Sequence, residues 1–410
     1  MKRNLSDFRY TMRNCARVES VISSQVMEVS KTILTQVRDV VSLFLLGGYG
    51  RGEGSVIIRP EGIVPLGDYD FLVISNFPHT APPEAYVSGL ESLQREFRLQ
   101  YPIGVDGIWK FRLPFVDKRI YWYEAKFGGK ILFGDERVLN LIPIYSGKDI
   151  ALNEVFSLIF NRLTGMLKRF NPNFLDCNIT EKQREHLIFQ SVKGILACGE
   201  SLLLFNGKYH FSYQKRCEIF CKSFQTDFGK WMLIDPSLKK DYAKATHFKL
   251  EPAFDMYDDA VKLWFKAKEH LLHTAAFSLN TTMLRSNVPT KKLKICEKLE
   301  DFPVFFQHRS KPQVLDFLIF NRRALKHLKS FNGFLPKRSS FSDIVRASLF
   351  YLALALHENG DVDQELLDGA LFAVSKIIPA AKKIAMEKDL IRKWQKARNI
   401  IFYAWTLCRH

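Results

Sequence analysis

The sequence lacks the features of a secreted or membrane-spanning protein. Its seven cysteines include no Cys-x-x-Cys pair, and an odd number of cysteines spread along the chain is typical of reduced, buried thiols. Residues 1–7 lack the apolar core of a signal peptide. The longest apolar stretches, 43–46 and 347–356, are too short to cross a bilayer. We therefore expect a cytoplasmic protein with no disulfides and no membrane partner.

The composition is not that of a disordered chain. Hydrophobic residues make up 47% of the 410 positions, which is enough for two or three cores. The net charge is +17, and because residues 1–150 hold nearly equal numbers of basic and acidic side chains, the later residues carry most of it. Such a surface attracts phosphates on nucleotides, nucleic acids or small molecules, although solvated lysines would give the same balance.

The spacing of the apolar residues predicts an α+β protein in two parts. The first part, residues 1–150, is expected to hold a small mixed sheet with flanking helices, and the second part, residues 151–410, to be mostly α-helical. The polar stretch at 225–255 could divide the second part into two lobes. In the first part we expect helices at 19–40 and 84–98, strands at 41–46, 69–75, 103–113, 119–127 and 131–134, and a loop or hairpin at 56–67. In the second part we expect helices at 151–170, 181–205, 256–275, 312–330, 341–357, 363–376 and 379–407.

A glycine-rich segment, residues 47–54, follows the predicted strand at 41–46. Glycines allow backbone amides to approach phosphate oxygens, a helix beginning near Arg51 or Gly52 would add its positive end, and Arg51 could add a charged contact. A tight turn without a ligand has the same composition. The segment is not a Walker A loop, because no Gly-Lys-Ser/Thr follows, and its glycine spacing is not that of a dinucleotide fingerprint.

Two aspartates, Asp68 and Asp70, open the next predicted strand. Residues two apart on a strand point to the same face, so we expect the two carboxylates to lie side by side and to need a cation between them. Oxygen ligands of this kind suit Mg²⁺, although an exposed turn would also explain the pair. A third carboxylate is needed if two ions are to bind. Asp106, one helix later, is the first choice, with Glu124 and then Asp117 as the alternatives.

These elements resemble the nucleotidyltransferase superfamily that includes DNA polymerase β and the aminoglycoside nucleotidyltransferases. The resemblance rests on Gly47-Gly48, Arg51-Gly52, Asp68-x-Asp70 and Asp106, which occur in this order over roughly residues 40–140. The chain departs from the family in two ways. Gly48 stands where many members have Ser, and the insertion at 56–67 lengthens the distance to the first Asp.

The resemblance implies a magnesium-dependent enzyme. It would transfer a nucleoside monophosphate from a nucleoside triphosphate, with ATP as the expected donor, to an acceptor hydroxyl and release pyrophosphate. Asp68 and Asp70 would bind two Mg²⁺ ions, and Asp106 would bind the ion that activates the acceptor. The acceptor could be a small molecule, a protein or an RNA.

The same resemblance suggests which groups hold the nucleotide. Gly47, Gly48 and Arg51 would contact it from the first part of the chain. A helical domain often closes over the nucleotide in this superfamily, and Arg162 and Lys193 are cations in apolar helical segments that need a partner. An ordinary salt bridge would satisfy them equally well. Two alternatives remain open: a catalytically inactive nucleotide-sensing or RNA-binding module, and a template-independent oligonucleotide synthase.

Overall fold

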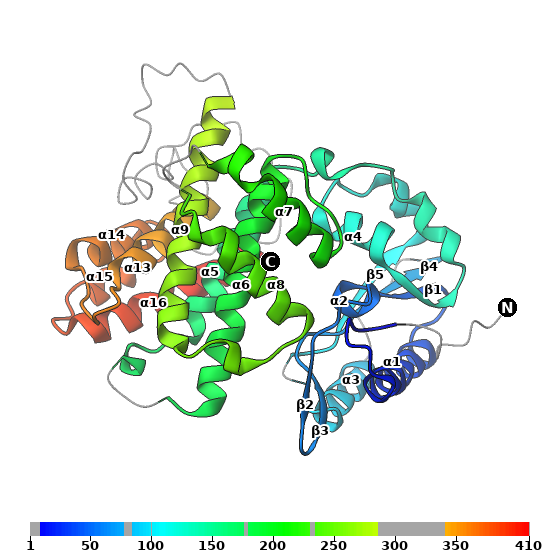
Figure 1. Cartoon of the computed structure of the whole chain (residues 1–410). Coiled ribbons are helices and arrows are strands. Elements are labelled where there is room, and N and C mark those ends of the chain that lie inside the picture. The colour runs from blue at the N-terminus through cyan, green and yellow to red at the C-terminus, as the bar shows by residue number, and fades with distance from the viewer. Residues whose placement is uncertain are drawn as a thin grey trace. The chain divides into compact units, whose positions relative to one another are not determined.

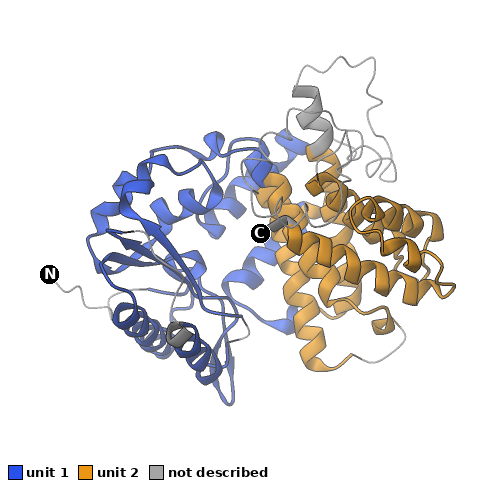
Figure 2. Cartoon of the chain, turned by 180° about the vertical axis from the view of Figure 1, so that it is seen from behind, with its two compact units in different colours: residues 1–154, 202–230, 239–256 blue, residues 155–201, 231–238, 257–410 orange. Residues whose placement is uncertain are grey.

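The computed structural model describes residues 9–77, 84–99, 101–175, 179–229, 234–285 and 341–409. The chain divides into two compact units (Figure 2). Unit 1 comprises residues 1–154, 202–230 and 239–256, and unit 2 comprises residues 155–201, 231–238 and 257–410. The helix predicted at 312–330 lies outside the described residues.

Unit 1 combines a small sheet with helices. Its elements are α1 (Ala16–Gln36), β1 (Val40–Leu45), α2 (Gly47–Gly50), β2 (Val56–Arg59), β3 (Gly62–Pro65), β4 (Asp70–Ser75), α3 (Glu84–Glu96), β5 (Gly104–Trp109), η2 (Lys110–Phe115), α4 (Ile120–Gly128), β6 (Lys130–Gly134), η3 (Glu136–Leu141), η4 (Gly147–Asp149), α7 (Tyr213–Phe228), α8 (Ser237–Leu250) and η6 (Phe254–Met256).

The main sheet has four strands in the order β5-β4-β1-β6. Strands β4 and β5 are parallel, whereas β1 is antiparallel to both β4 and β6, so the sheet is mixed. The predicted α+β class with a small mixed sheet is therefore confirmed, and so is the helical C-terminal region. The insertion at 56–67 forms the separate hairpin of β2 and β3.

Helices α1 and α3 lie side by side against one face of this sheet (Figure 1). Helix α1 forms because apolar residues recur at helical spacing, and its Val18, Ile22, Val26, Val29 and Ile33 are all fully buried. They share a core with Leu43, Leu45, Phe71 and Val73, which are alternate residues of β1 and β4. The intervening residues, among them Phe44 and Leu72, therefore point to the opposite face.

Two local predictions in unit 1 were wrong, and the strand predicted at 103–113 ends at Trp109, where η2 follows. The run at 119–127, expected to be a strand from its aromatic residues, is helix α4. Strand propensity is readily overridden by tertiary contacts, and the helix allows Glu124 to pair with Arg51 and Lys126 to donate to the carbonyls of Leu139 and Ile142. The helix expected from Arg51 is the single turn α2, which ends before Gly52 because that residue adopts a left-handed φ of 77°.

Unit 2 is helical in its described part. Its elements are α5 (Asn153–Arg169), η5 (Pro172–Phe174), most of α6 (Glu181–Phe205), α9 (Ala260–Arg285), α13 (Phe341–Ala355), α14 (Gln364–Ser375), α15 (Ala381–Ile384) and α16 (Leu390–Arg409). The segment predicted as one helix at 379–407 is divided into α15 and α16, because Asp389 accepts a hydrogen bond from the amide of Arg392 and starts a new helix.

Helix α6 is the one described helix that is long and apolar enough to cross a membrane by length and composition. However, 89% of its most apolar window is buried inside the protein, a property that core helices share. The residues at 202–230 and 239–256, which the sequence placed in the helical region, belong to unit 1. They contain α7 and most of α8.

Candidate active site

The side chain of Asp70 lies between two glycines. Asp70 is the first residue of β4, next to the start of α2 on one side and the start of β5 on the other. A Cβ atom at Gly47 would lie 2.8 Å from Asp70 Oδ2, and one at Gly104 would lie 2.9 Å from Asp70 Oδ1. Gly47 also has a φ of 62°, which favours glycine. The glycine segment and the aspartate that the sequence singled out are thus in direct contact.

Asp106 lies on the neighbouring parallel strand. Its register partner in β4 is Leu72, whereas Gly104 is opposite Asp70. Asp70 and Leu72 share a face, so Asp106 lies on the same face as Asp70, one diagonal step away. That step corresponds to roughly 8 Å between Cα atoms, which carboxylate side chains can bridge through a bound ion. Asp106 is exposed, and Asp70 is half-buried.

Tyr121, at the start of α4, is a near neighbour of both carboxylates. Its hydroxyl is buried and makes no hydrogen bond of good geometry. The pKa of Tyr121 is raised above its usual value, mainly by burial. The nearby Asp106 makes the next largest contribution, and the charge of Asp70 makes a smaller one. Because the phenol stays protonated, it is a donor held beside Asp106 without an aligned bond. Asp70, Asp106 and Tyr121 therefore share one small space on the sheet face away from α1 and α3.

Asp68 differs from its expected position. Strand β4 begins only at Asp70, and Asp68 is exposed just ahead of it. Tyr69 between them is buried, with its ring 4.7 Å from that of Tyr49 and its hydroxyl donating to Gln25. Within the described ranges, no three His, Cys, Asp or Glu side chains converge closely enough to hold a metal ion. The expected trio of Asp68, Asp70 and Asp106 is therefore not assembled as a ready-made metal cage.

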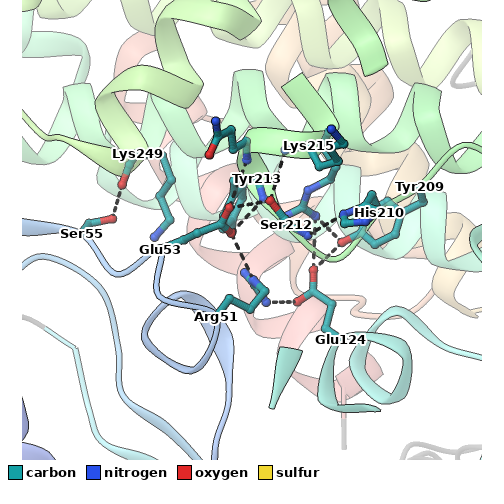
Figure 3. A network of polar contacts seen from close by, with 12 residues as sticks. Arg51, Glu53, Ser55, Glu124, Tyr209, His210, Ser212, Tyr213, Lys215 and Lys249 are labelled. Carbon is teal, nitrogen blue, oxygen red and sulfur yellow. Dashed lines mark hydrogen bonds and ion pairs between the residues drawn. The ribbon is translucent and has the colours of Figure 1, made fainter. Parts of the chain in front are cut away.

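The side chain of Arg51 points into a buried polar network instead of into open space (Figure 3). The exposed fraction of the side chain is 2%. Its Nη1 atom lies 2.8 Å from Glu124 Oε2, and its Nε atom lies 3.4 Å from Glu53 Oε2. The guanidinium also lies 5.1 Å from the centre of the Tyr213 ring. The charge of Arg51, expected to meet a nucleotide, is thus balanced by two carboxylates.

Glu53 connects the glycine segment to the beginning of α7. Its carboxylate accepts hydrogen bonds from the Ser212 hydroxyl at 2.7 Å and from the amides of Tyr213 and Gln214 at 2.9 and 3.2 Å (Figure 3). A carboxylate at this place satisfies the free amides of the first helical turn and complements the helix dipole.

Glu124, the alternative third metal ligand, is committed to the same network. Arg51 contacts one of its oxygens, and Arg216 and the Tyr209 hydroxyl contact the other. Burial would raise the pKa of Glu124, but Arg51 and Arg216 outweigh it and hold the pKa below its usual value. Glu124 is therefore an ionised partner of two arginines. Asp117, the other alternative, is exposed and pairs with Arg119 at 3.5 Å.

The two remaining predicted nucleotide-binding residues are in unit 2. Arg162 lies on α5 and is half-buried. Lys193 lies on α6, with its Nζ atom 4.5 Å from the centre of the Phe189 ring. This contact is within α6, because Phe189 belongs to the same helix.

Three residues in this region were not identified from the sequence. Tyr121 was hidden in an aromatic run that resembled a strand, and Glu53 in a string of glycines that directs attention to the backbone. Lys249, on α8, lies with its Nζ atom 3.8 Å from the position of a Cβ atom at Gly67, which precedes Asp68. No local pattern signalled Lys249, because it belongs to a segment that lies 182 residues after Gly67 in the chain.

Comparison of the chain with protein-family models, with curated proteins and with solved structures gave no match.

Proposed function

We propose that this protein is a magnesium-dependent nucleotidyltransferase. It moves a nucleoside monophosphate from a nucleoside triphosphate to an acceptor hydroxyl and releases pyrophosphate. The proposal rests on the position of the Asp70 carboxylate between Gly47 and Gly104. Asp106 lies on the adjacent strand and on the same face of the sheet. A glycine turn beside two acidic side chains supports the nucleotidyltransferase fold that the order of these motifs in the sequence suggested.

The chemistry of these side chains fits Mg²⁺. Both acids supply hard oxygen ligands, and protein sites for Mg²⁺ commonly use one or two carboxylates together with water and substrate phosphates. A site with fewer than three convergent protein ligands is thus compatible with an ion that arrives with the nucleotide. Bound there, magnesium would lower the pKa of the acceptor hydroxyl and neutralise charge on the departing pyrophosphate.

The protein's own groups have distinct tasks in this proposal. Asp70, which lies between the two glycines, would hold the magnesium ion. The exposed Asp106 lies where an acceptor hydroxyl can approach and can accept its proton. The protonated Tyr121 is a hydrogen-bond donor held beside Asp106 and can help to orient that carboxylate. Asp68 is accessible to solvent and can complete the ligand set once the nucleotide is bound.

A second candidate is a module that binds a nucleotide without turnover. The exposed position of Asp68, outside β4, favours it, because the resemblance to the nucleotidyltransferases assigns the two ions to both Asp68 and Asp70.

The test is incubation with each labelled nucleoside triphosphate and Mg²⁺, with candidate acceptors, while pyrophosphate release is followed. Release by the wild type that is lost in Asp70→Asn and Asp106→Asn but kept in Asp117→Asn would support the transferase. Asp117 is a matched control because it is an exposed aspartate near the site in sequence. Binding without release would favour the module, and product ladders would favour an oligonucleotide synthase. A wild type that neither binds nor turns over any triphosphate would overturn the proposal.

A further inference from the structure

We infer that Arg51 is a positioning residue that fixes helix α4 against the glycine segment, and that it does not bind the substrate phosphate. The inference rests on the proposed function, since the groups that Arg51 would position are those of the proposed transfer. It also reverses the role that the resemblance implied for this residue.

The surroundings of Arg51 leave no direction for a ligand. Its guanidinium is enclosed by Glu124, Glu53 and the ring of Tyr213, and its side chain is 2% exposed. Its stem lies against the end of α4, where a Cβ atom at Gly128 would be 2.6 Å from Arg51 Cγ. A phosphate could reach the guanidinium only by displacing a buried carboxylate, which would leave an uncompensated charge.

Helix α4 connects this network to the acidic pair. Arg51 contacts the helix at two places, by the ion pair with Glu124 and by packing against Gly128. Tyr121 lies three residues before Glu124, on the same side of the helix and about one turn away. Because Tyr121 is the neighbour of Asp106 and Asp70, any movement of α4 along its axis changes the surroundings of both acids.

The glycine segment is held by the same side chain. Arg51 follows Gly47 by four residues, and Gly47 contacts the Asp70 carboxylate. The adjacent Glu53 fastens the segment to the first turn of α7. Arg51 thus connects the two elements, α4 and the segment 47–54, that border the carboxylates from different sides.

The deciding experiment is a double-mutant cycle of Arg51→Gln and Glu124→Gln. If Arg51 is a positioning residue, each single variant lowers kcat by at least roughly tenfold and leaves triphosphate affinity within about twofold of wild type. The double variant is then no slower than the slower single variant, because both substitutions break the Arg51–Glu124 pair that connects α4 to the segment 47–54. Arg51→Lys keeps the charge but loses the forked contact, and it should recover only part of the rate.

A phosphate ligand gives a different outcome. Arg51→Gln would then weaken triphosphate binding, Glu124→Gln would not, and the effects would be independent; this result would overturn the inference. The matched control is the exposed pair of Asp135 and Arg137, whose Asn and Gln variants should change neither quantity.

Hydrogen exchange of the free protein tests the same link without any activity. Glu124→Gln should speed amide exchange both in residues 120–128 and in residues 47–54, whereas the Asp135→Asn control should not. If the amide exchange rates of residues 47–54 are unchanged in Glu124→Gln, the inference is overturned, whether or not this variant is active. If the wild type releases no pyrophosphate, the proposed function fails, and the exchange result alone decides whether Arg51 couples the two segments.

Discussion

Alanine at Gly47 is expected to lower both activity and stability. The residue adopts a φ of 62°, which costs an alanine roughly 1–2 kcal/mol. Its new Cβ atom would lie 2.8 Å from Asp70 Oδ2, so that the carboxylate must move by several tenths of an ångström. Because a misplacement of about 1 Å can cost about 100-fold in rate, we expect kcat to fall roughly 10- to 100-fold.

Gly104→Ala separates the clash from the backbone strain. A Cβ atom there would lie 2.9 Å from Asp70 Oδ1, but the residue has no left-handed φ. We expect a similar loss of rate with an unfolding free energy within about 1 kcal/mol of wild type. Gly360→Ala is the opposite control, since its φ is 89° and its nearest neighbour, Leu175 Cδ1, is at an ordinary 3.6 Å. It should lose stability and keep the rate.

The assays are pyrophosphate release at saturating triphosphate and chemical denaturation of the same preparations. The reasoning would be refuted if the Gly47 and Gly104 variants both kept the wild-type rate, because the carboxylate they displace would then have no part in the reaction. Equal losses of rate in the Gly360 variant would point to general destabilisation instead.

Three further predictions concern single side chains. Tyr121→Phe should leave the unfolding free energy within about 1 kcal/mol, because the lost hydroxyl has no aligned partner, yet lower kcat by removing the donor beside Asp106; thermal melts and initial rates check this. The pKa of Glu124 in the folded protein is below its ordinary 4.5. Its contribution to stability is therefore complete above about pH 4.5 and is lost as the pH falls through the lowered pKa. Denaturation between about pH 6 and pH 3 should show a smaller pH dependence of stability in Glu124→Gln than in the wild type. Burial lowers the pKa of Lys268 from 10.5 to about 8, so the unfolded chain binds this proton more tightly and stability should rise by up to about 3 kcal/mol over that pH range. Lys268→Met should make this rise smaller, and the exposed Lys382→Met should not; an equal pH dependence of stability in the wild type and in Lys268→Met would contradict the assignment.

The parts of the fold that depend on local pattern could be predicted from the sequence. The buried valines of α1 recur at helical spacing, and the apolar runs of β1 and β4 are bounded by turns. Helix α4 could not be predicted in this way, because its aromatic residues favour a strand and its helical form depends on partners such as Arg51, 73 residues away from Glu124.

The same distinction holds for the candidate site. The contact of the glycine segment with Asp70 follows from the strand–turn–strand order, and the parallel pairing of β4 and β5 brings Asp106 to the same face. The orientation of Arg51 could not be inferred, because whether a guanidinium faces a ligand or a buried acid depends on residues far along the chain. The prediction that Asp68 points to the same face as Asp70 assumed that both residues belong to one strand, but β4 begins only at Asp70.

The discontinuity of unit 1 limits how the protein can be shortened. A fragment ending at residue 150 would retain the sheet but would lose the amides of Tyr213 and Gln214 that bind Glu53, and the carbonyl of Lys249 that accepts from Ser55. A cut at residue 150 would therefore expose surfaces that are covered in the intact unit, and it would leave the glycine segment without its hydrogen-bond partners. A minimal version should instead run to residue 256, with short linkers in place of the stretches that belong to the other unit.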